Sequence, residues 1–131
     1  MEKKIFIGIV VASLLLVGII AYRPGASAAP PAGAVPAVQN ADGSQTIDIT
    51  ARGGYSPRLV SAKAGIPTTI RVITQDTYDC SASLVIPKVG LRKLLSSNGT
   101  EEINISADKA QGTLNGLCGM GMYSFKIVFN L

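Results

Sequence analysis

The alternation of apolar and polar residues in the C-terminal part of the chain is the feature that most limits its fold. From Gln45 onward, short runs place an apolar residue at about every second position, and Gly, Pro, Asn and Asp separate the runs. Side chains on a β-strand point alternately to opposite faces, so this period predicts strands with one buried face. The clearest expected strands are residues 46–51, 68–74, 101–105 and 123–130.

The remaining runs of this region are shorter and less regular. They predict strands at residues 59–62, 84–86 and 111–115, whereas residues 89–95 fit either a strand or a single irregular turn. Signals for helices are nearly absent. Seven or eight short strands at this spacing predict an all-β Greek-key β-sandwich.

The N-terminal segment has a different pattern, because residues 5–22 form an uncharged run of 18 residues preceded by Lys3 and Lys4. A helix of that length is about 27 Å long at ~1.5 Å per residue, close to the thickness of the hydrocarbon core of a membrane. We therefore expect residues 1–22 to form one transmembrane helix with its lysines in the cytoplasm. This orientation predicts a single-pass protein of the cell membrane whose C-terminal domain is extracellular or periplasmic.

A cleaved signal sequence is the alternative for the N-terminus, because Ala26-Ser27-Ala28 resembles a signal-peptidase site. The apolar run is longer than the usual signal-peptide core of about 7–15 residues, which favours the uncleaved anchor. Residues 23–44 are rich in Ala, Pro and Gly and predict a flexible linker. The expected domain boundaries are thus 1–22 for the anchor, 23–44 for the linker and 45–131 for the folded domain.

Charge and composition exclude two classes of function. The net charge of +4 is spread over single basic residues, and Arg92-Lys93 is the only adjacent basic pair after residue 22. Without a basic stripe, we expect no nucleic-acid partner. The chain also has no histidine, so a Ser/His/Asp or Cys/His catalytic arrangement is impossible, and we expect that the protein is not an enzyme.

The segment Cys118-Gly119-Met120-Gly121-Met122 contains every methionine except Met1 and one of the two cysteines. Thiolate and thioether sulfurs are soft ligands that select Cu(I) over the hard cations preferred by carboxylates. In an extended backbone, alternate residues project to one side, so Cys118, Met120 and Met122 would face the same direction. Cys80 would complete the site from another loop. We expect this site to bind one or two Cu(I) ions.

A disulfide is the alternative for the cysteines, because Cys80 and Cys118 are the only pair in a domain that we expect to be exported. This alternative explains the methionines poorly, since both lie among glycines in a turn region and not in an apolar strand. The two interpretations are compatible, because an oxidised apo form could be bridged and a reduced form could bind copper.

Several segments resemble the cupredoxin family. Tyr55-Ser56-Pro57 before a strand looks like the family's aromatic-x-Pro segment, residues 78–87 look like the segment with the first metal ligand, and Cys118 stands at the cysteine before the last strand. Blue-copper members bind the metal with two histidines, a cysteine and an axial methionine. Here Cys80 replaces the first histidine and nothing replaces the second, which argues against electron transfer.

The chain is more similar to the membrane-anchored, cupredoxin-fold Cu(I) chaperones of the CupA type, which share the N-terminal helix, a lone cysteine and the C-x-M-x-M loop. The resemblance implies that Cys80 and Cys118 bridge a binuclear Cu(I) site and that Met120 and Met122 complete a weaker position. It also implies sequestration of copper and transfer to a copper-exporting P-type ATPase or another acceptor. The alternatives are a divergent electron-transfer cupredoxin and a disulfide-locked β-sandwich that binds no metal.

Overall fold

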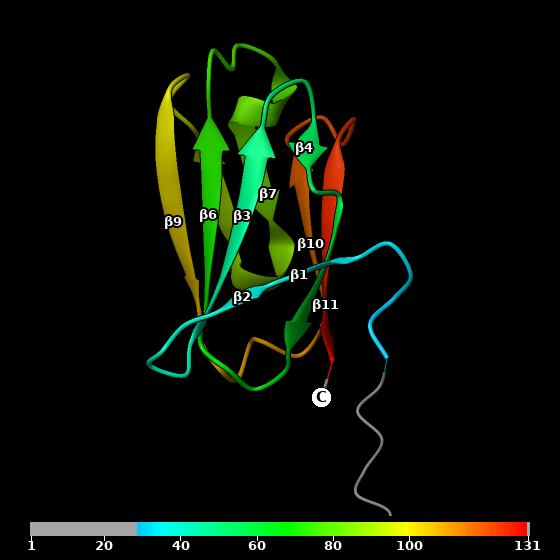
Figure 1. The fold of residues 1–131 in the computed structure, drawn as a ribbon. Helices are drawn as coiled ribbons and strands as arrows, with labels where there is room; N and C mark the ends of the chain where they lie inside the picture. Colours follow the sequence, from blue (N-terminus) through cyan, green and yellow to red (C-terminus); the bar gives the residue numbers. More distant parts are fainter. Residues whose placement is uncertain (1–28, 131) are drawn as a thin grey trace, which may run out of the picture.

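Two β-sheets pack face to face in the computed structural model, which describes residues 29–130 (Figure 1). One sheet has six strands in the order β1 (Val35–Pro36), β5 (Leu59–Lys63), β11 (Ser124–Asn130), β10 (Gly112–Cys118), β7 (Ser83–Ile86) and β8 (Leu91–Leu94). The other contains β2 (Val38–Gln39), β3 (Gln45–Ala51), β6 (Thr68–Thr74) and β9 (Gly99–Ile105), with β4 (Tyr55–Ser56) paired to β3. The expected all-β sandwich is confirmed.

The alternating runs of the sequence form the facing layers of the core. In β6, Ile70 and Val72 are buried, and in β11 the buried residues are Phe125, Ile127 and Phe129. The neighbouring residues on these strands are half-buried or exposed. Burial of such aliphatic and aromatic side chains stabilises a fold by about 1.5–3 kcal/mol each. The period-two pattern therefore places one face of each sheet in the interior.

Pairing between strands that are distant in sequence holds the two layers in register. In one sheet β3 runs parallel to β6, with Ile47 opposite Ile70, and β6 runs antiparallel to β9. In the other sheet β11 runs parallel to β5 and antiparallel to β10. Parallel neighbours need long connections, and the chain crosses between the sheets after β1, β4, β5, β6, β8 and β9.

Strand pairing begins earlier than the expected start of the domain at Gln45. Residues 35–39 lie in the segment that we predicted to be a flexible linker, yet β1 pairs with β5 and β2 pairs with β3. The segment has no alternating pattern because each strand has only two residues and both are exposed. Its hydrogen bonds come from partners that lie far along the chain, so local sequence did not reveal them.

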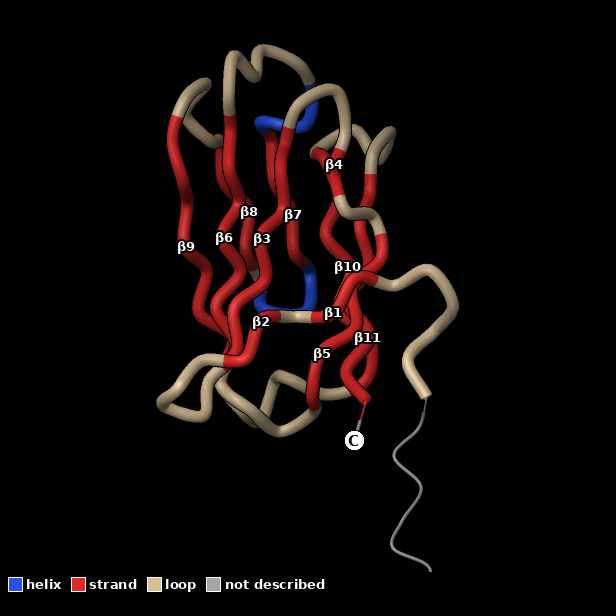
Figure 2. Tube along the Cα trace, viewed as in Figure 1, coloured by secondary structure: helices blue, strands red, loops and turns tan. Residues whose placement is uncertain are grey.

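Residues 87–94 combine both structures that the sequence left open. A short 3-10 helix, η2 (Pro87–Val89), ends at Gly90, and strand β8 then pairs with β7. Figure 2 shows η2 and a second 3-10 helix, η1 (Cys80–Ala82), in blue at opposite ends of the sandwich. Among residues 29–130, no helix is long and apolar enough to cross a membrane, and the candidate span 5–22 lies outside this described part.

A buried glutamine connects the two sheets at the end where β3 begins. Gln45 is fully buried, and its Nε2 donates to the Lys63 carbonyl at 2.7 Å and to Thr68 Oγ1 at 2.9 Å. Its Oε1 accepts from the Lys63 N–H at 3.0 Å and from Gln39 Nε2 at 3.1 Å. Because Lys63 belongs to the other sheet, this side chain joins the layers through satisfied hydrogen bonds. We call this region the Gln45 end.

Candidate metal centre

The two cysteines meet at the opposite end of the sandwich, which we call the sulfur end. Cys80 begins η1 and Cys118 ends β10, where Cys118 is opposite Leu84 of β7. The Cys80 and Cys118 thiols lie close enough for each to shift the pKa of the other, and both cysteines are free thiols. The structure therefore brings together two of the predicted ligands that are 38 positions apart in the sequence.

Asp79 fixes the position of η1 and so of Cys80. Its carboxylate caps the helix by accepting from the Ser81 N–H at 3.2 Å and from Ser81 Oγ at 2.9 Å. The same carboxylate accepts from the Gly53 N–H at 3.2 Å, which ties η1 to the loop after β3. These bonds lower the pKa of Asp79 against the opposing effect of burial, so the cap is ionised at neutral pH.

Tyr55 holds η1 in place through a hydrogen bond from its side chain. Its Oη donates to the Ser81 carbonyl at 3.0 Å, and its ring meets Phe125 edge-on with centroids 5.2 Å apart. Burial raises the pKa of Tyr55, and the neighbouring Cys118, Cys80 and Asp79 raise it further. The hydroxyl thus remains a hydrogen-bond donor throughout the physiological pH range. Tyr55 belongs to the aromatic-x-Pro segment, whose role here is to hold the loop that carries Cys80.

The segment from Cys118 to Met122 is a tight turn and not the extended strand on which we based the same-side arrangement of sulfurs. The Cys118 N–H donates to the Tyr123 carbonyl at 3.0 Å, and the Gly121 N–H donates to the Cys118 carbonyl at 2.8 Å. Gly121 has a φ of +71°, which glycine adopts without strain. The turn arises because β10 and β11 form a hairpin here. As a result Cys118 is buried, whereas Met120 and Met122 are 78% and 64% exposed.

Gly119 allows this turn to lie against β7. Its N–H donates to the Ser83 carbonyl at 2.8 Å, and a Cβ at this position would lie 2.6 Å from Ser83 Oγ. A larger residue would force the Ser83 hydroxyl to move from its place at the start of β7, directly after η1. The glycine therefore sets the approach of the Cys118 turn to the Cys80 segment.

The environments of the two thiols differ. Burial raises the pKa of Cys118, but the hydrogen bond from Cys80 and the backbone N–H groups of Tyr123, Met120 and Met122 outweigh it and lower the value to about 7. The hydrogen bond to Cys118 raises the pKa of the half-buried Cys80. Cys118 is thus the thiol that ionises first, and a larger fraction of it is the thiolate, the metal-binding form, at neutral pH.

The donor set of the sulfur end matches a soft monovalent cation. Within residues 29–130 no three His, Cys, Asp or Glu side chains form a cluster that could bind a metal ion, so the candidate ligands here are the two cysteines and the neighbouring methionines. Two thiols in contact and two thioethers on the adjoining turn are ligands that suit Cu(I) and offer no imidazole for Cu(II). The predicted residues Cys80, Cys118, Met120 and Met122 therefore fit Cu(I) as cargo.

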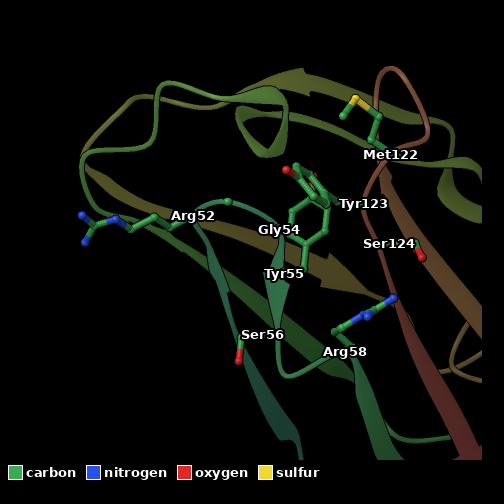
Figure 3. A pocket seen from close by; sticks show the side chains of 9 residues that line it. Arg52, Gly54, Tyr55, Ser56, Arg58, Met122, Tyr123 and Ser124 are labelled. Atoms are coloured by element: carbon green, nitrogen blue, oxygen red, sulfur yellow. The ribbon is translucent and has the colours of Figure 1, made fainter.

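A pocket beside the turn of residues 118–122 was not predicted from the sequence. It has a volume of about 410 Å³ and is lined by Arg52, Gly53, Gly54, Tyr55, Ser56, Arg58, Met122, Tyr123 and Ser124. Figure 3 shows Arg52 and Arg58 on opposite sides of the two tyrosine rings, with Met122 on the turn above them. No local sequence pattern indicates it, because the lining comes from residues 52–58 and from the β10–β11 turn, which meet only in the folded chain.

Comparisons with known proteins agree with this architecture. A search of curated proteins found no match. Among solved structures, the metal-binding domain of the Cu(I)-exporting P-type ATPase CopA of Streptococcus pneumoniae D39, solved with Cu(I), is 23% identical with a TM-score of 0.65. That likeness covers 72% of this chain and 93% of the ATPase domain, and at this identity it shows the fold alone.

A second structure is described as the solution structure of a copper-binding protein in its apo form. It is 27% identical with a TM-score of 0.65, and the match covers 73% of this chain and 96% of that protein. The family model of the cupredoxin-like domain matches residues 15–128, which is most of the chain. The protein therefore belongs to the family of cupredoxin-like domains.

Proposed function

We propose that this protein binds Cu(I) through Cys80 and Cys118, with Met120 and Met122 completing a weaker position, and that it sequesters copper and passes it to an acceptor. The observation that carries the proposal is the contact between two free thiols beside a turn with two exposed thioethers. The role is binding and exchange without catalysis. The proposal goes beyond the similarity in fold to copper-binding domains, because it names the four residues that would bind the metal.

The different exposure of the sulfurs supports both holding and release. The Cys118 sulfur lies in a buried site with backbone N–H groups that stabilise its thiolate, which favours tight retention. The thioethers of Met120 and Met122 are neutral, weaker ligands and face solvent, so an incoming ligand can reach an ion held there. Ligand exchange can then begin at the methionines and end at the thiolates.

The comparisons support copper as the cargo. One similar structure is a copper-binding protein, and the other is a domain of a Cu(I)-exporting ATPase. A copper-exporting P-type ATPase, the acceptor that the resemblance to CupA-type chaperones implies, is our candidate acceptor. We further propose that residues 1–22 anchor the protein in the cell membrane as a single pass and place residues 45–131 on the extracellular or periplasmic side, where the protein contributes to copper homeostasis.

Anaerobic competition against a chromogenic Cu(I) chelator tests the ligand assignment. For the reduced full-length chain, Cys80→Ser and Cys118→Ser should each weaken Cu(I) binding by more than about a hundredfold, beyond the 10–100-fold typical for loss of an outer-sphere partner. Circular dichroism of each variant checks that the fold is retained. Unchanged affinity in both folded variants would refute the assignment.

Native mass spectrometry of the reduced chain gives the number of ions. We expect one Cu(I) at low loading and a second at higher loading. No mass gain would leave only the metal-free β-sandwich. An intense visible charge-transfer band on adding Cu(II), bleached reversibly on reduction, would favour electron transfer over exchange.

A further inference from the structure

The pocket beside the turn of residues 118–122 carries an unbalanced positive charge. Arg52 and Arg58 are both exposed, and no carboxylate lines the pocket. The ion pairs in residues 29–130 are Arg71 with Asp48 and Lys93 with Glu101, so neither pocket arginine has such a partner in that part of the chain. Two guanidinium groups without partners are available for carboxylates, which they can bind in a bidentate manner.

The positive surface continues along β11. A second pocket of about 410 Å³ shares Arg58 and Ser124 with the first and is lined further by Leu59, Asn115, Phe125 and Lys126. The Lys126 N–H donates to the Arg58 carbonyl at 2.8 Å, which places the two residues side by side. Neither pocket is lined by a carboxylate. We call Arg52, Arg58 and Lys126 the basic strip.

Asp79 is the acidic residue that contacts this region, and its carboxylate already accepts other hydrogen bonds. Asp79 accepts from the Gly53 N–H at 3.2 Å, next to Arg52, but its oxygens also accept from the N–H and Oγ of Ser81. It acts as the cap of η1, and no ion pair joins it to Arg52 among the described residues. The basic strip therefore keeps its charge available for another molecule.

Exposed apolar side chains adjoin the basic strip at the sulfur end. Tyr78, two residues before Cys80, is 80% exposed, and Met120 and Met122 are 78% and 64% exposed. Met122 also lines the arginine pocket, so it joins the exposed methionine turn to the basic strip. Interfaces between proteins are enriched in tyrosine, methionine and arginine. A small anion would occupy the pocket and leave these apolar residues uncovered.

We propose that this surface docks the protein with which Cu(I) is exchanged, and that the partner presents carboxylates to the basic strip. The apolar residues Tyr78, Met120 and Met122 would contact the region around the partner's own copper ligands. This inference rests on the proposed function and specifies the chemistry of the partner. The basic strip steers the encounter, so it sets the rate of exchange and not the affinity of the sulfurs for copper.

Synthetic donor peptides test the proposal on the full-length chain in detergent micelles. Each peptide contains Cys-Gly-Gly-Cys loaded with Cu(I) and a dansyl group that the metal quenches, flanked by aspartates in one version and by serines in the other. Recovery of fluorescence under anaerobic conditions reports transfer to the chain. The test variant is R52E/R58E, and the matched control is R92E/K109E, which has the same change in charge at residues outside both pockets.

We expect R52E/R58E to slow transfer from the aspartate peptide by about tenfold and from the serine peptide by less than about twofold. R92E/K109E should leave both rates within about twofold, and R52K/R58K should restore most of the rate because it restores the charge. Salt near 1 M, where the Debye length is about 3 Å, should remove the advantage of the aspartate peptide.

Equal slowing of both peptides, or equal slowing by the two charge-reversal variants, would overturn the docking proposal. Failure of the proposed function gives a different result, because the wild-type chain would then take no copper from either peptide and would bind none in chelator competition.

Discussion

The two ends of the sandwich are built on opposite principles. At the Gln45 end, a fully buried side chain satisfies donors and acceptors of both sheets, and nothing in that arrangement is left to bind another molecule. At the sulfur end, Cys118 is buried but free, and Met120 and Met122 face solvent. In the proposed function, stability and copper exchange are therefore separated in space. The following predictions test how complete that separation is.

Replacing the polar side chain of Gln45 should affect stability alone. Gln45→Met keeps a similar volume but leaves the Lys63 N–H and carbonyl and the Thr68 hydroxyl without this partner. Unsatisfied buried groups cost about 1–3 kcal/mol each, so we expect the free energy of unfolding to fall by about 3 kcal/mol. Urea denaturation measures this loss, and chelator competition should show unchanged Cu(I) affinity. A parallel loss of affinity would mean that the two ends are coupled.

Lowering the pH should weaken Cu(I) binding at the sulfur end, because the ligands there are titratable thiols, whereas Gln45 does not titrate. Binding of Cu(I) displaces a proton from each thiol that is still protonated. Above pH 7, Cys118 is mostly ionised and Cys80, whose pKa is raised, releases one proton, whereas below pH 7 both thiols release one. Affinity should therefore rise about tenfold per pH unit above 7 and about a hundredfold per unit below it.

Competition titrations from pH 6 to pH 8, corrected for protonation of the chelator, measure this slope. A slope that stays constant across this range would contradict the lowered pKa of Cys118. In the Cys118→Ser variant the steeper limb should disappear, because the remaining thiol releases one proton throughout.

Removing the cap of η1 should displace Cys80 without removing any sulfur. We expect Asp79→Ala to weaken Cu(I) binding by about tenfold, as for loss of a residue that orients a ligand, and to lower stability by about 1 kcal/mol. Asp42→Ala is the matched control, because Asp42 also accepts from the N–H and Oγ of the serine two residues later, near the Gln45 end. Asp42→Ala should leave copper affinity unchanged, and Asp79→Asn should restore most of it. Chelator competition on all three variants compares these effects.

The smallest structural effect is expected at the methionines. Because Met120 and Met122 are mostly exposed, changing both to alanine should alter the free energy of unfolding by less than about 0.5 kcal/mol. The tightly bound ion should remain, and the second, weaker ion should be lost in native mass spectrometry. Loss of the tight ion would show that the thioethers hold copper together with the thiolates.

The sequence predicted those parts of the fold that depend on alternation within one segment. Strands β3, β6, β9 and β11 follow from their own buried residues, and β5, β7 and β10 were expected with small shifts at their ends. Strands β1, β2 and β4 have two residues each, too few for any period, and exist only through pairing with other strands.

The same distinction applies to the candidate site. Residue chemistry identified the sulfurs, and the structure brings Cys80 and Cys118 into contact, while metal binding by the four residues remains a prediction. The glycines indicated a turn region, but the sequence did not place the bend at Gly121, because the i, i+2 argument for the sulfurs assumes an extended backbone. The basic strip was missed because Arg58 and Lys126 are 68 positions apart in the sequence and become neighbours only through the pairing of β5 with β11.

The early start of strand pairing at Val35 has a consequence for how far the domain can move. In the proposed arrangement, only residues 23–34 separate the membrane segment from β1. This limits the length of the linker to roughly 40 Å at about 3.3–3.6 Å per residue. A short linker keeps the sulfur end at an effective concentration on the order of millimolar near partners in the same membrane. Separation of β1 from β5 and of β2 from β3 would add residues 35–44 to the linker and lower this effective concentration. Two strands of two residues thus set the volume that the domain can search.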